Sequence, residues 1–170
     1  MKFLVSFFMC ITAFFATAQD QVVQSNINGL LGYNQGQIAA LAQEFSEDQY
    51  DWRPSEGVRS VRETILHLAS ANYYIASGLG FTAPEDVDMQ AIEQITGKEN
   101  VIAALNKSFE FVKDKLGQIP STDFGKEVDL GFMKTSTLSG MLIILDHSGE
   151  HKGQLIAYAR SNGVVPPWSK

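Results

Sequence analysis

The stretch Leu138–Ser161, LSGMLIILDHSGEHKGQLIAYARS, has the residue pattern of one long amphipathic helix. Its apolar residues recur three or four positions apart, which is the spacing of a helix face and not of a strand. Because residues four apart lie above one another on a helix, His147 and His151 point the same way. Most of their neighbours on this face are small or apolar, so we expect both imidazoles to face a core or a cleft. The other residues on the face are Gly140, Ile144, Gln154 and Tyr158.

The third histidine of the chain, His67, lies inside a second amphipathic stretch, Val61–Ser77. A neutral imidazole offers a lone pair near pH 7, so a histidine pair four residues apart is a good half of a metal site. A third imidazole from a neighbouring helix completes three corners of a tetrahedron and leaves the fourth open, as in catalytic zinc sites. Imidazole also binds nickel, iron and copper, so these ligands do not select the metal. From the residues alone, three ordinary core histidines remain an open alternative.

Two more stretches have a helical period, Val22–Phe45 and a third one that ends near Gly117. Together with the two histidine-bearing stretches they make four amphipathic segments with little strand signal, which predicts an all-α fold, a four-helix bundle. A long segment, Gly78–Ile95, separates the second and third helices, so a simple up-and-down order of the helices does not follow from the sequence. Gln118–Thr135 is also long for a plain loop, which indicates a lid or a wall of a site.

Capping patterns mark where two of these helices begin. A serine or threonine followed three residues later by glutamate is the signature of a capping box. Ser60 and Glu63 therefore predict a helix that begins at Val61. Thr96 and Glu99 show the same pattern and predict the beginning of the third helix.

The first eighteen residues have the composition of a secretory signal peptide. A short basic start precedes an apolar run, Phe3–Phe15, and a small-x-small cleavage sequence, Ala16–Ala18. The apolar run is shorter than the roughly 20 residues that a membrane span needs. We therefore predict a signal peptide at residues 1–18, a bundle domain at residues 19–170, and an exported protein, either periplasmic or secreted.

Cysteine content and charge narrow the classes of partner. The single cysteine, Cys10, lies inside the predicted signal peptide, so the mature chain has neither disulfides nor thiolate ligands. The formal net charge of −6 becomes −7 once Lys2 is removed, with 12 basic and 19 acidic residues left. Without a basic block, the sequence argues against a nucleic-acid partner, and nothing favours a membrane surface after signal removal. The expected partner is a small-molecule substrate of unknown identity, and the helix faces leave a homodimer open.

Several short motifs, in a fixed order, resemble those of the DinB/YfiT-like superfamily, and they span essentially the whole mature chain. The most specific is the block H-x-x-x-H-[RK]-G-Q, which runs here from His147 to Gln154. The resemblance implies a four-helix bundle that holds one divalent metal ion, zinc, nickel or iron, on His67, His147 and His151. The supporting motifs are Trp52-Arg53-Pro54, Arg59-Ser60-Val61, Asp146 before the histidine block, Tyr158, Asn162-Gly163 and Pro166-Pro167.

The neighbours of the histidines have weaker expected roles. Gln154 shares the histidine face and could orient a ligand or a bound water. Lys152 is expected to point to solvent. Asp146 and Glu150 lie about 100° around the helix from the histidines, so we expect them to be solvated or to pair with another helix. Glu63, one turn before His67, is assigned to the capping box and not to the metal. No side chain is identified as a catalytic acid or base.

The resembled superfamily includes metal-dependent thiol transferases and isomerases as well as enzymes classed as hydrolases. An open metal site suits either chemistry, because the metal activates a bound water or thiol. Low-molecular-weight thiols are cytosolic cofactors, so the predicted export favours a metal-dependent hydrolase that uses a metal-bound water. A metal-dependent thiol transferase and a non-catalytic bundle that binds a metal or a ligand are the alternatives.

Overall fold

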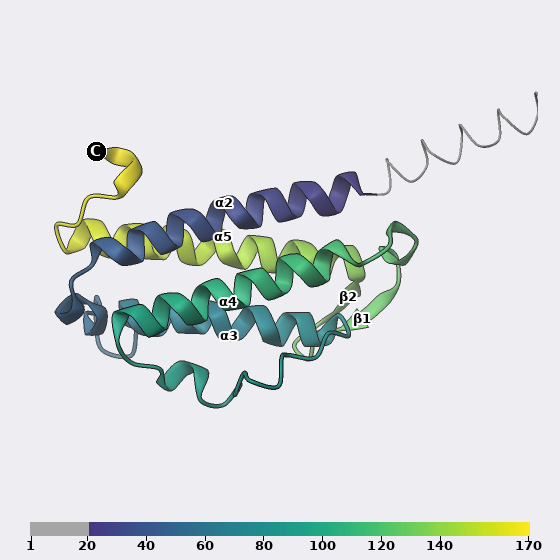
Figure 1. Cartoon of the computed structure of the whole chain (residues 1–170), viewed down its shortest axis with the longest axis horizontal. Helices are drawn as coiled ribbons and strands as arrows, with labels where there is room; N and C mark the ends of the chain where they lie inside the picture. The colour runs from purple at the N-terminus through teal and green to yellow at the C-terminus, as the bar shows by residue number, and fades with distance from the viewer. Residues whose placement is uncertain (1–20) are drawn as a thin grey trace, which may run out of the picture.

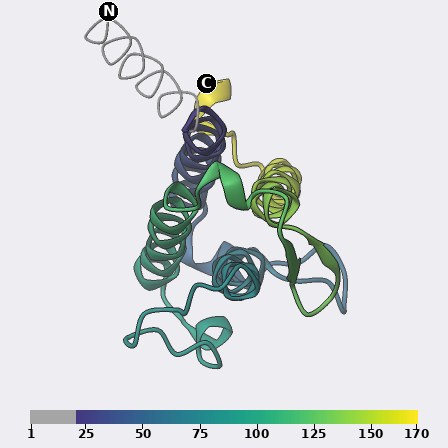
Figure 2. The same cartoon turned by 90° about the vertical axis from the view of Figure 1, so that its right-hand side faces the viewer.

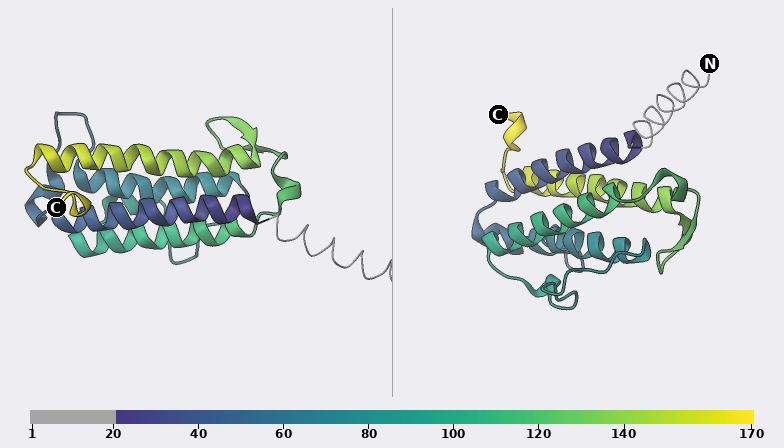
Figure 3. Two further views of the ribbon diagram at one scale, coloured as in Figure 1. Left: turned by 90° about the horizontal axis from the view of Figure 1, so that it is seen from above. Right: turned by 45° about the vertical axis from the view of Figure 1, so that its right-hand side comes forward.

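The structure, a computed structural model, describes residues 21–170, which form a bundle of four long α-helices. The helices lie side by side over most of their lengths (Figure 1), and two further views show the same arrangement (Figure 3). The predicted all-α four-helix bundle is confirmed. The helices are α2 (Val22–Glu44), α3 (Val61–Gly78), α4 (Lys98–Gly117) and α5 (Thr137–Ser161).

Each helix packs against two others, and the view along the bundle shows a four-cornered arrangement (Figure 2). Around the bundle, α2 contacts α4, α4 contacts α3, α3 contacts α5, and α5 contacts α2. The helices α2 and α4 are antiparallel, since the Lys98 amine at the beginning of α4 donates to the carbonyls of Gln43 and Phe45 at the end of α2. The helices α3 and α4 run in the same direction. The segment that connects α3 to α4 therefore returns along the length of the bundle, and a simple up-and-down order of the helices is excluded.

Buried polar pairs fix how neighbouring helices are aligned along their axes. The amide of Asn34 on α2 donates to the Ser148 hydroxyl on α5 at 2.8 Å, and Asn72 on α3 donates to Ser108 on α4 at 3.0 Å. All four residues are buried, and a buried donor without an acceptor costs about 1–3 kcal/mol, so a slipped alignment is penalised. The apolar core surrounds these pairs. Its largest fully buried side chains include Phe45, Phe109, Leu31, Leu66, Leu105 and Met141.

The helix starts agree with the capping prediction at one position and contradict it at another. The Ser60 hydroxyl accepts from the Glu63 amide at 3.2 Å, and the Glu63 carboxylate accepts from the Ser60 amide at 2.8 Å, so this capping box is confirmed. The capping box predicted at Thr96 is wrong. The helix begins one residue later than that pattern requires, at Lys98, and the residue before it is Gly97 with a φ of +83°. This left-handed conformation suits glycine and leaves Thr96 outside the capping position.

The connections contain short elements that the sequence did not indicate in full. The segment from α3 to α4, residues 79–97 and here named the crossover, runs along the outside of both helices (Figure 1). Its one regular piece is the 3₁₀ helix η2, Ile92–Gln94. Three other 3₁₀ helices are η1 (Glu47–Asp51), η3 (Ser121–Asp123) and η4 (Pro167–Ser169).

The segment between α4 and α5 forms a small antiparallel hairpin. Its strands are β1 (Glu127–Asp129) and β2 (Lys134–Ser136). The turn packs closely on the end of α3, because a Cβ added to Gly78 would lie 2.8 Å from the Leu130 Cα. The hairpin thus occupies the end of the bundle where α5 begins (Figure 1).

The predictions of a signal peptide and of no membrane association compare with the structure as follows for the described residues. The predicted signal peptide, residues 1–18, lies outside the described residues. Within residues 21–170, no helix combines the length and the apolar character required to cross a bilayer.

Candidate metal centre

The helices α3 and α5 bring the three histidines together. One ligand nitrogen from each ring can be chosen so that all three lie within 4.8 Å of one another. The ring centres of His147 and His151 are 4.4 Å apart, and His67 lies 5.3 Å from the first and 5.0 Å from the second. His151 is only 6% exposed, and the other two are partly buried. Since α3 and α5 are antiparallel neighbours, one residue on α3 faces the i, i+4 pair on α5.

A chain of three hydrogen bonds fixes the orientation of His151. Its Nδ1 lies 2.7 Å from the Gln154 Oε1, the Gln154 Nε2 donates to the Tyr158 hydroxyl at 2.7 Å, and that hydroxyl donates to the Arg59 carbonyl at 3.0 Å. A carbonyl oxygen can only accept, so the directions of all three bonds follow from the Arg59 end. His151 must carry its proton on Nδ1, which leaves a lone pair on Nε2. The predicted orienting role of Gln154 agrees with this geometry.

The second ring, His147, faces that lone pair. The Nε2 atoms of His147 and His151 are 3.0 Å apart, and the Nδ1 of His147 is buried without a hydrogen-bond partner among residues 21–170. Two nitrogens that share a tetrahedral zinc ion at about 2.05 Å are separated by about 3.4 Å. The observed separation is a few tenths of an ångström shorter. These donors fit a divalent cation with three imidazole ligands and a free fourth position.

The surroundings of His147 and His67 lower the pKa of both rings, which favours their neutral forms. Burial lowers the pKa of His147 to about 4, and a charge on His151 or His67 when either is protonated, together with the charge of Arg59, opposes its protonation further. Burial, followed by the charge of Arg59, also lowers the pKa of His67. A neutral imidazole is the form that binds a metal, so less proton release is needed for metal binding here than at exposed histidines.

A carboxylate from the crossover lies beside the third ring. The Glu93 Oε1 is 3.6 Å from the His67 Nδ1 and opposes the lowering of the His67 pKa. Glu93 belongs to η2, and the sequence analysis missed it. No local signal could have found it, because the residue lies 26 positions from His67 in a segment without periodicity.

Other residues near the histidines have structural roles. Asp146 and Glu150 are exposed, as predicted. Glu63 caps α3 and pairs with Arg53 at 3.1 Å. The prediction that Lys152 points to solvent is wrong, because its amine donates to the Asn34 Oδ1 at 2.7 Å. Its flexible four-carbon stem lets the ammonium reach across to α2.

Only one of the two long connections approaches the histidines. The crossover contributes Glu93, whereas the segment between α4 and α5, predicted to be a lid or a site wall, packs through Leu130 on Gly78 and Gly140. Gly140 precedes His147 by seven residues, or about 10 Å along α5.

Trp52 packs edge-on against Tyr158, with ring centres 5.3 Å apart, and so covers the hydrogen-bonded chain of His151.

Comparison with known proteins identifies the family of this bundle. The sequence profile of the DinB superfamily matches residues 31–155. The chain therefore belongs to the DinB superfamily. The matched region contains His67, His147 and His151, so the whole candidate centre lies within the family domain.

Solved structures support the same fold. A DinB-like protein from Bacillus subtilis is 20% identical, with a TM-score of 0.65 over 82% of this chain and 93% of that one. A conserved protein from Enterococcus faecalis is 15% identical, with a TM-score of 0.67 over 80% and 94% of the two chains. A DinB-like protein from Bacillus cereus is 15% identical, with a TM-score of 0.58 over 80% and 90%. No functionally curated protein has significant sequence similarity to the chain.

Proposed function

We propose that the protein binds one divalent metal ion through His67, His147 and His151 and catalyses a metal-dependent hydrolysis. The observation that carries the proposal is the combination of convergence and orientation. Three imidazoles meet at one point, and the chain from Arg59 to Gln154 directs the unprotonated Nε2 of His151 toward His147. Ordinary core histidines are hydrogen-bonded too, but they need not bring three ring nitrogens within 4.8 Å of one another.

Some residues of the site would bind the ion, and others orient the residues that bind it. A divalent ion bound there supplies Lewis acidity, which lowers the pKa of a coordinated water or thiol toward neutral pH. Gln154 holds His151 in one tautomer, and the negative charge of Glu93 lies 3.6 Å from the Nδ1 of His67. Zinc, nickel and iron all suit three imidazoles, so the ligand set leaves the metal open.

Hydrolysis is favoured over thiol transfer by the predicted signal peptide. An exported protein meets few of the small thiols that cytosolic transferases use, whereas water is always present. Thiol transfer and binding of a metal or ligand without turnover are the competing functions. Within residues 21–170, the cluster of possible metal ligands contains the three histidines and no carboxylate, which is the observation in favour of the non-catalytic alternative.

The first test is elemental analysis of protein purified without a histidine tag. We expect about one equivalent of a divalent metal in the parent and none in the variant His147→Ala/His151→Ala. The matched control is Asp146→Ala/Glu150→Ala, which removes two exposed side chains with the same spacing one position earlier on α5. A metal-free parent that also fails to take up zinc, nickel or iron would refute the metal centre.

The second test separates the three functions. The metal-loaded parent is incubated with ester and amide substrates, with and without an added low-molecular-weight thiol. Turnover without thiol supports hydrolysis, and turnover only with thiol supports transfer. A metal-loaded protein that turns over none of these substrates under either condition supports a binding protein.

Export is tested on the same protein in its native cell. We expect the mature chain outside the cytoplasm, with Gln19 as its first residue by amino-terminal sequencing. A cytoplasmic chain that still begins at Met1 would remove the argument against thiol transfer.

A further inference from the structure

The two nitrogens of each histidine ring have different roles at a metal site. A ring binds the metal through one unprotonated nitrogen, and the group that faces the other nitrogen decides which of the two carries the proton. For His151 that group is the Gln154 amide oxygen, whereas the Nδ1 of His147 has no hydrogen-bond partner among residues 21–170. The third ring is His67, and the group that faces its Nδ1 is the carboxylate of Glu93.

The contact between Glu93 and His67 is electrostatic. The Glu93 Oε1 lies 3.6 Å from the His67 Nδ1, which is longer than a hydrogen bond. A negative charge at this distance attracts the positive end of an N–H bond and repels a nitrogen lone pair. The His67 side chain is only 24% exposed, so water screens this charge incompletely. The tautomer with its proton on Nδ1 is therefore favoured, and Nε2 is left unprotonated.

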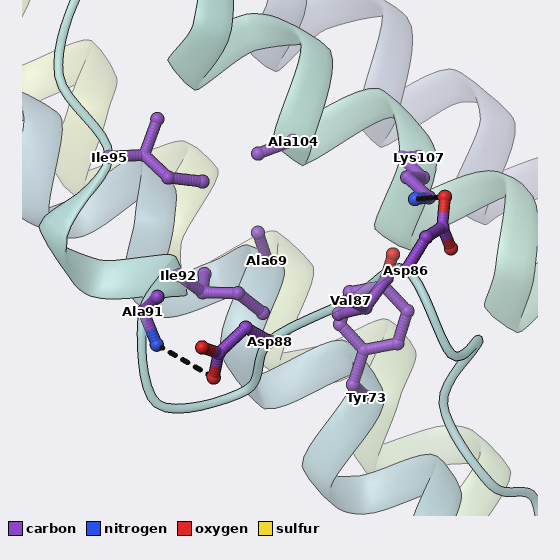
Figure 4. A pocket seen from close by; sticks show the side chains of 10 residues that line it. All are labelled: Ala69, Tyr73, Asp86, Val87, Asp88, Ala91, Ile92, Ile95, Ala104 and Lys107. Atoms are coloured by element: carbon purple, nitrogen blue, oxygen red, sulfur yellow. Dashed lines mark hydrogen bonds and ion pairs between the residues drawn. The ribbon is translucent and has the colours of Figure 1, made fainter.

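The backbone that carries Glu93 is fixed by its neighbours in the crossover. Ile92 is buried in the apolar core, and η2 packs against α3. Before η2, the carboxylate of Asp88 accepts from the amide of Ala91, which Figure 4 shows as a dashed line. These contacts hold the crossover on α3, so Glu93 stays beside His67 although its own side chain is exposed.

The other acidic residues of the crossover have different surroundings. Asp86 pairs with Lys107, and Asp88 accepts from backbone amides. Glu85 is exposed. Within the described part of the chain, Glu93 forms no ion pair with a lysine or an arginine, so no cation competes with His67 for its charge.

We propose that Glu93 is a positioning residue of the metal centre, which holds the proton of His67 on Nδ1 and leaves Nε2 to bind the ion. The inference rests on the proposed function, since it concerns the same three histidines. It gives the crossover a function beyond connecting two helices. Two of the three rings are then oriented by groups on different elements, His151 by Gln154 on α5 and His67 by Glu93 on η2.

The first experiment measures the tautomer of His67 in metal-free protein. NMR of the ring nitrogens is recorded at about pH 8, above the ordinary pKa of a histidine ring. We expect the proton on Nδ1 in the parent and in Glu85→Ala, the same change at the other glutamate of the crossover. Glu93→Ala should lose this preference. A parent with the proton on Nε2, or a preference that survives in Glu93→Ala, would overturn the proposal whether or not the protein binds a metal.

The second experiment measures metal affinity by competition with a colorimetric chelator. Glu93→Ala should weaken binding by about 10–100-fold, the usual effect of removing a group that orients a metal-binding histidine. Glu93→Gln, which keeps an oxygen acceptor, should lose less, and Glu85→Ala should lose nothing. Urea unfolding should show metal-free Glu93→Ala to be as stable as the parent, because the side chain is exposed.

The outcomes separate this proposal from the proposed function. A parent that binds no metal would refute the proposed function, and with it the metal-binding role of the His67 Nε2. A parent that binds metal, with unchanged affinity in Glu93→Ala, would overturn the role of Glu93 alone. A loss of stability in metal-free Glu93→Ala without a loss of affinity would show that the residue acts in the fold and not on the ring.

Discussion

The two sides of α3 show opposite ways of burying a polar group. Toward α5, the hydroxyl of Tyr158 accepts from Gln154 and donates to the Arg59 carbonyl, so it forms part of a continuous chain that ends at His151. Toward α4 and the crossover, the hydroxyl of Tyr73 is buried without a hydrogen-bond partner among residues 21–170. The same chemical group is thus satisfied on one side and unsatisfied on the other.

The difference shows which polar groups the fold itself completes. On the histidine side, the protein supplies every partner of Tyr158 and Gln154, which is what an oriented metal ligand requires. On the other side, the hydroxyl of Tyr73 is enclosed by the protein without a hydrogen-bond partner in the described part of the chain. The polar groups around His151 therefore stabilise the fold, whereas the Tyr73 hydroxyl costs it free energy.

The largest expected effect comes from removing the metal from the histidine side. At a metal concentration of about 1,000 times Kd, binding adds about 4 kcal/mol to the free energy of unfolding. We expect a chelator to remove this stabilisation from the parent and to leave His147→Ala/His151→Ala unchanged. Urea unfolding with and without chelator measures it. A parent that is equally stable in both would contradict a metal bound to the folded state.

The next effect comes from breaking the chain that orients His151. Gln154→Ala should weaken metal affinity by about 10–100-fold, because the ring loses the acceptor that fixes its tautomer. Competition with a colorimetric chelator gives the affinity. Gln154→Glu, which retains an acceptor, should lose less, and Gln90→Ala, at an exposed glutamine, should lose nothing. Unchanged affinity in Gln154→Ala would show that packing alone orients the ring.

The same substitution on the two sides should differ in sign. In metal-free protein, Tyr158→Phe should lower the free energy of unfolding by about 1–3 kcal/mol, since the Gln154 amide is left without its acceptor. Tyr73→Phe removes an unsatisfied hydroxyl and should leave stability equal or raise it by up to about 1 kcal/mol. Urea midpoints of both variants provide the comparison. A loss of stability in Tyr73→Phe would indicate that the hydroxyl already has a partner.

The smallest effect concerns the beginning of α3, which both sides share. The amide of Ser60 donates to Glu63 and lowers the pKa of that carboxyl. Because the carboxyl has a lower pKa in the folded state than in the unfolded state, it stabilises the native state at pH values above the unfolded pKa, near 4.5. This contribution is lost as the pH falls through the folded pKa. Glu63→Gln should therefore cost up to about 1 kcal/mol at pH 7 and converge on the parent in acid. A constant difference from pH 7 to pH 3 would assign the effect to packing.

Much of the bundle follows from local sequence patterns. Hydrophobic periodicity locates all four helices, because each helix must bury one apolar face. Wherever the sequence predicted a helix end, that end lies within a residue or two of the observed one. The start of α4 was missed by its capping pattern, since a glycine in the left-handed region precedes the helix. The hairpin has strands of three residues, which are too short to show a period.

The two sites differ in how much the sequence reveals. His67, His147 and His151 stand out because histidine is rare in this chain and the pair has helical spacing. The link from Tyr158 to Arg59 joins residues 99 positions apart, and no local pattern specifies it. The pocket between α3, α4 and the crossover is still less visible (Figure 4), because its walls include alanine on three elements, and alanine is too common to mark a site.

The 3₁₀ helix η2 links the crossover to the metal centre through the backbone. Ile92 is buried in the apolar core, and Glu93, the next residue, lies 3.6 Å from the His67 ring. Because adjacent residues move together, any shift of η2 changes the position of the carboxylate beside a metal-binding ring. The coupling is reciprocal, so a metal ion whose affinity depends on the position of Glu93 also stabilises that position of the crossover.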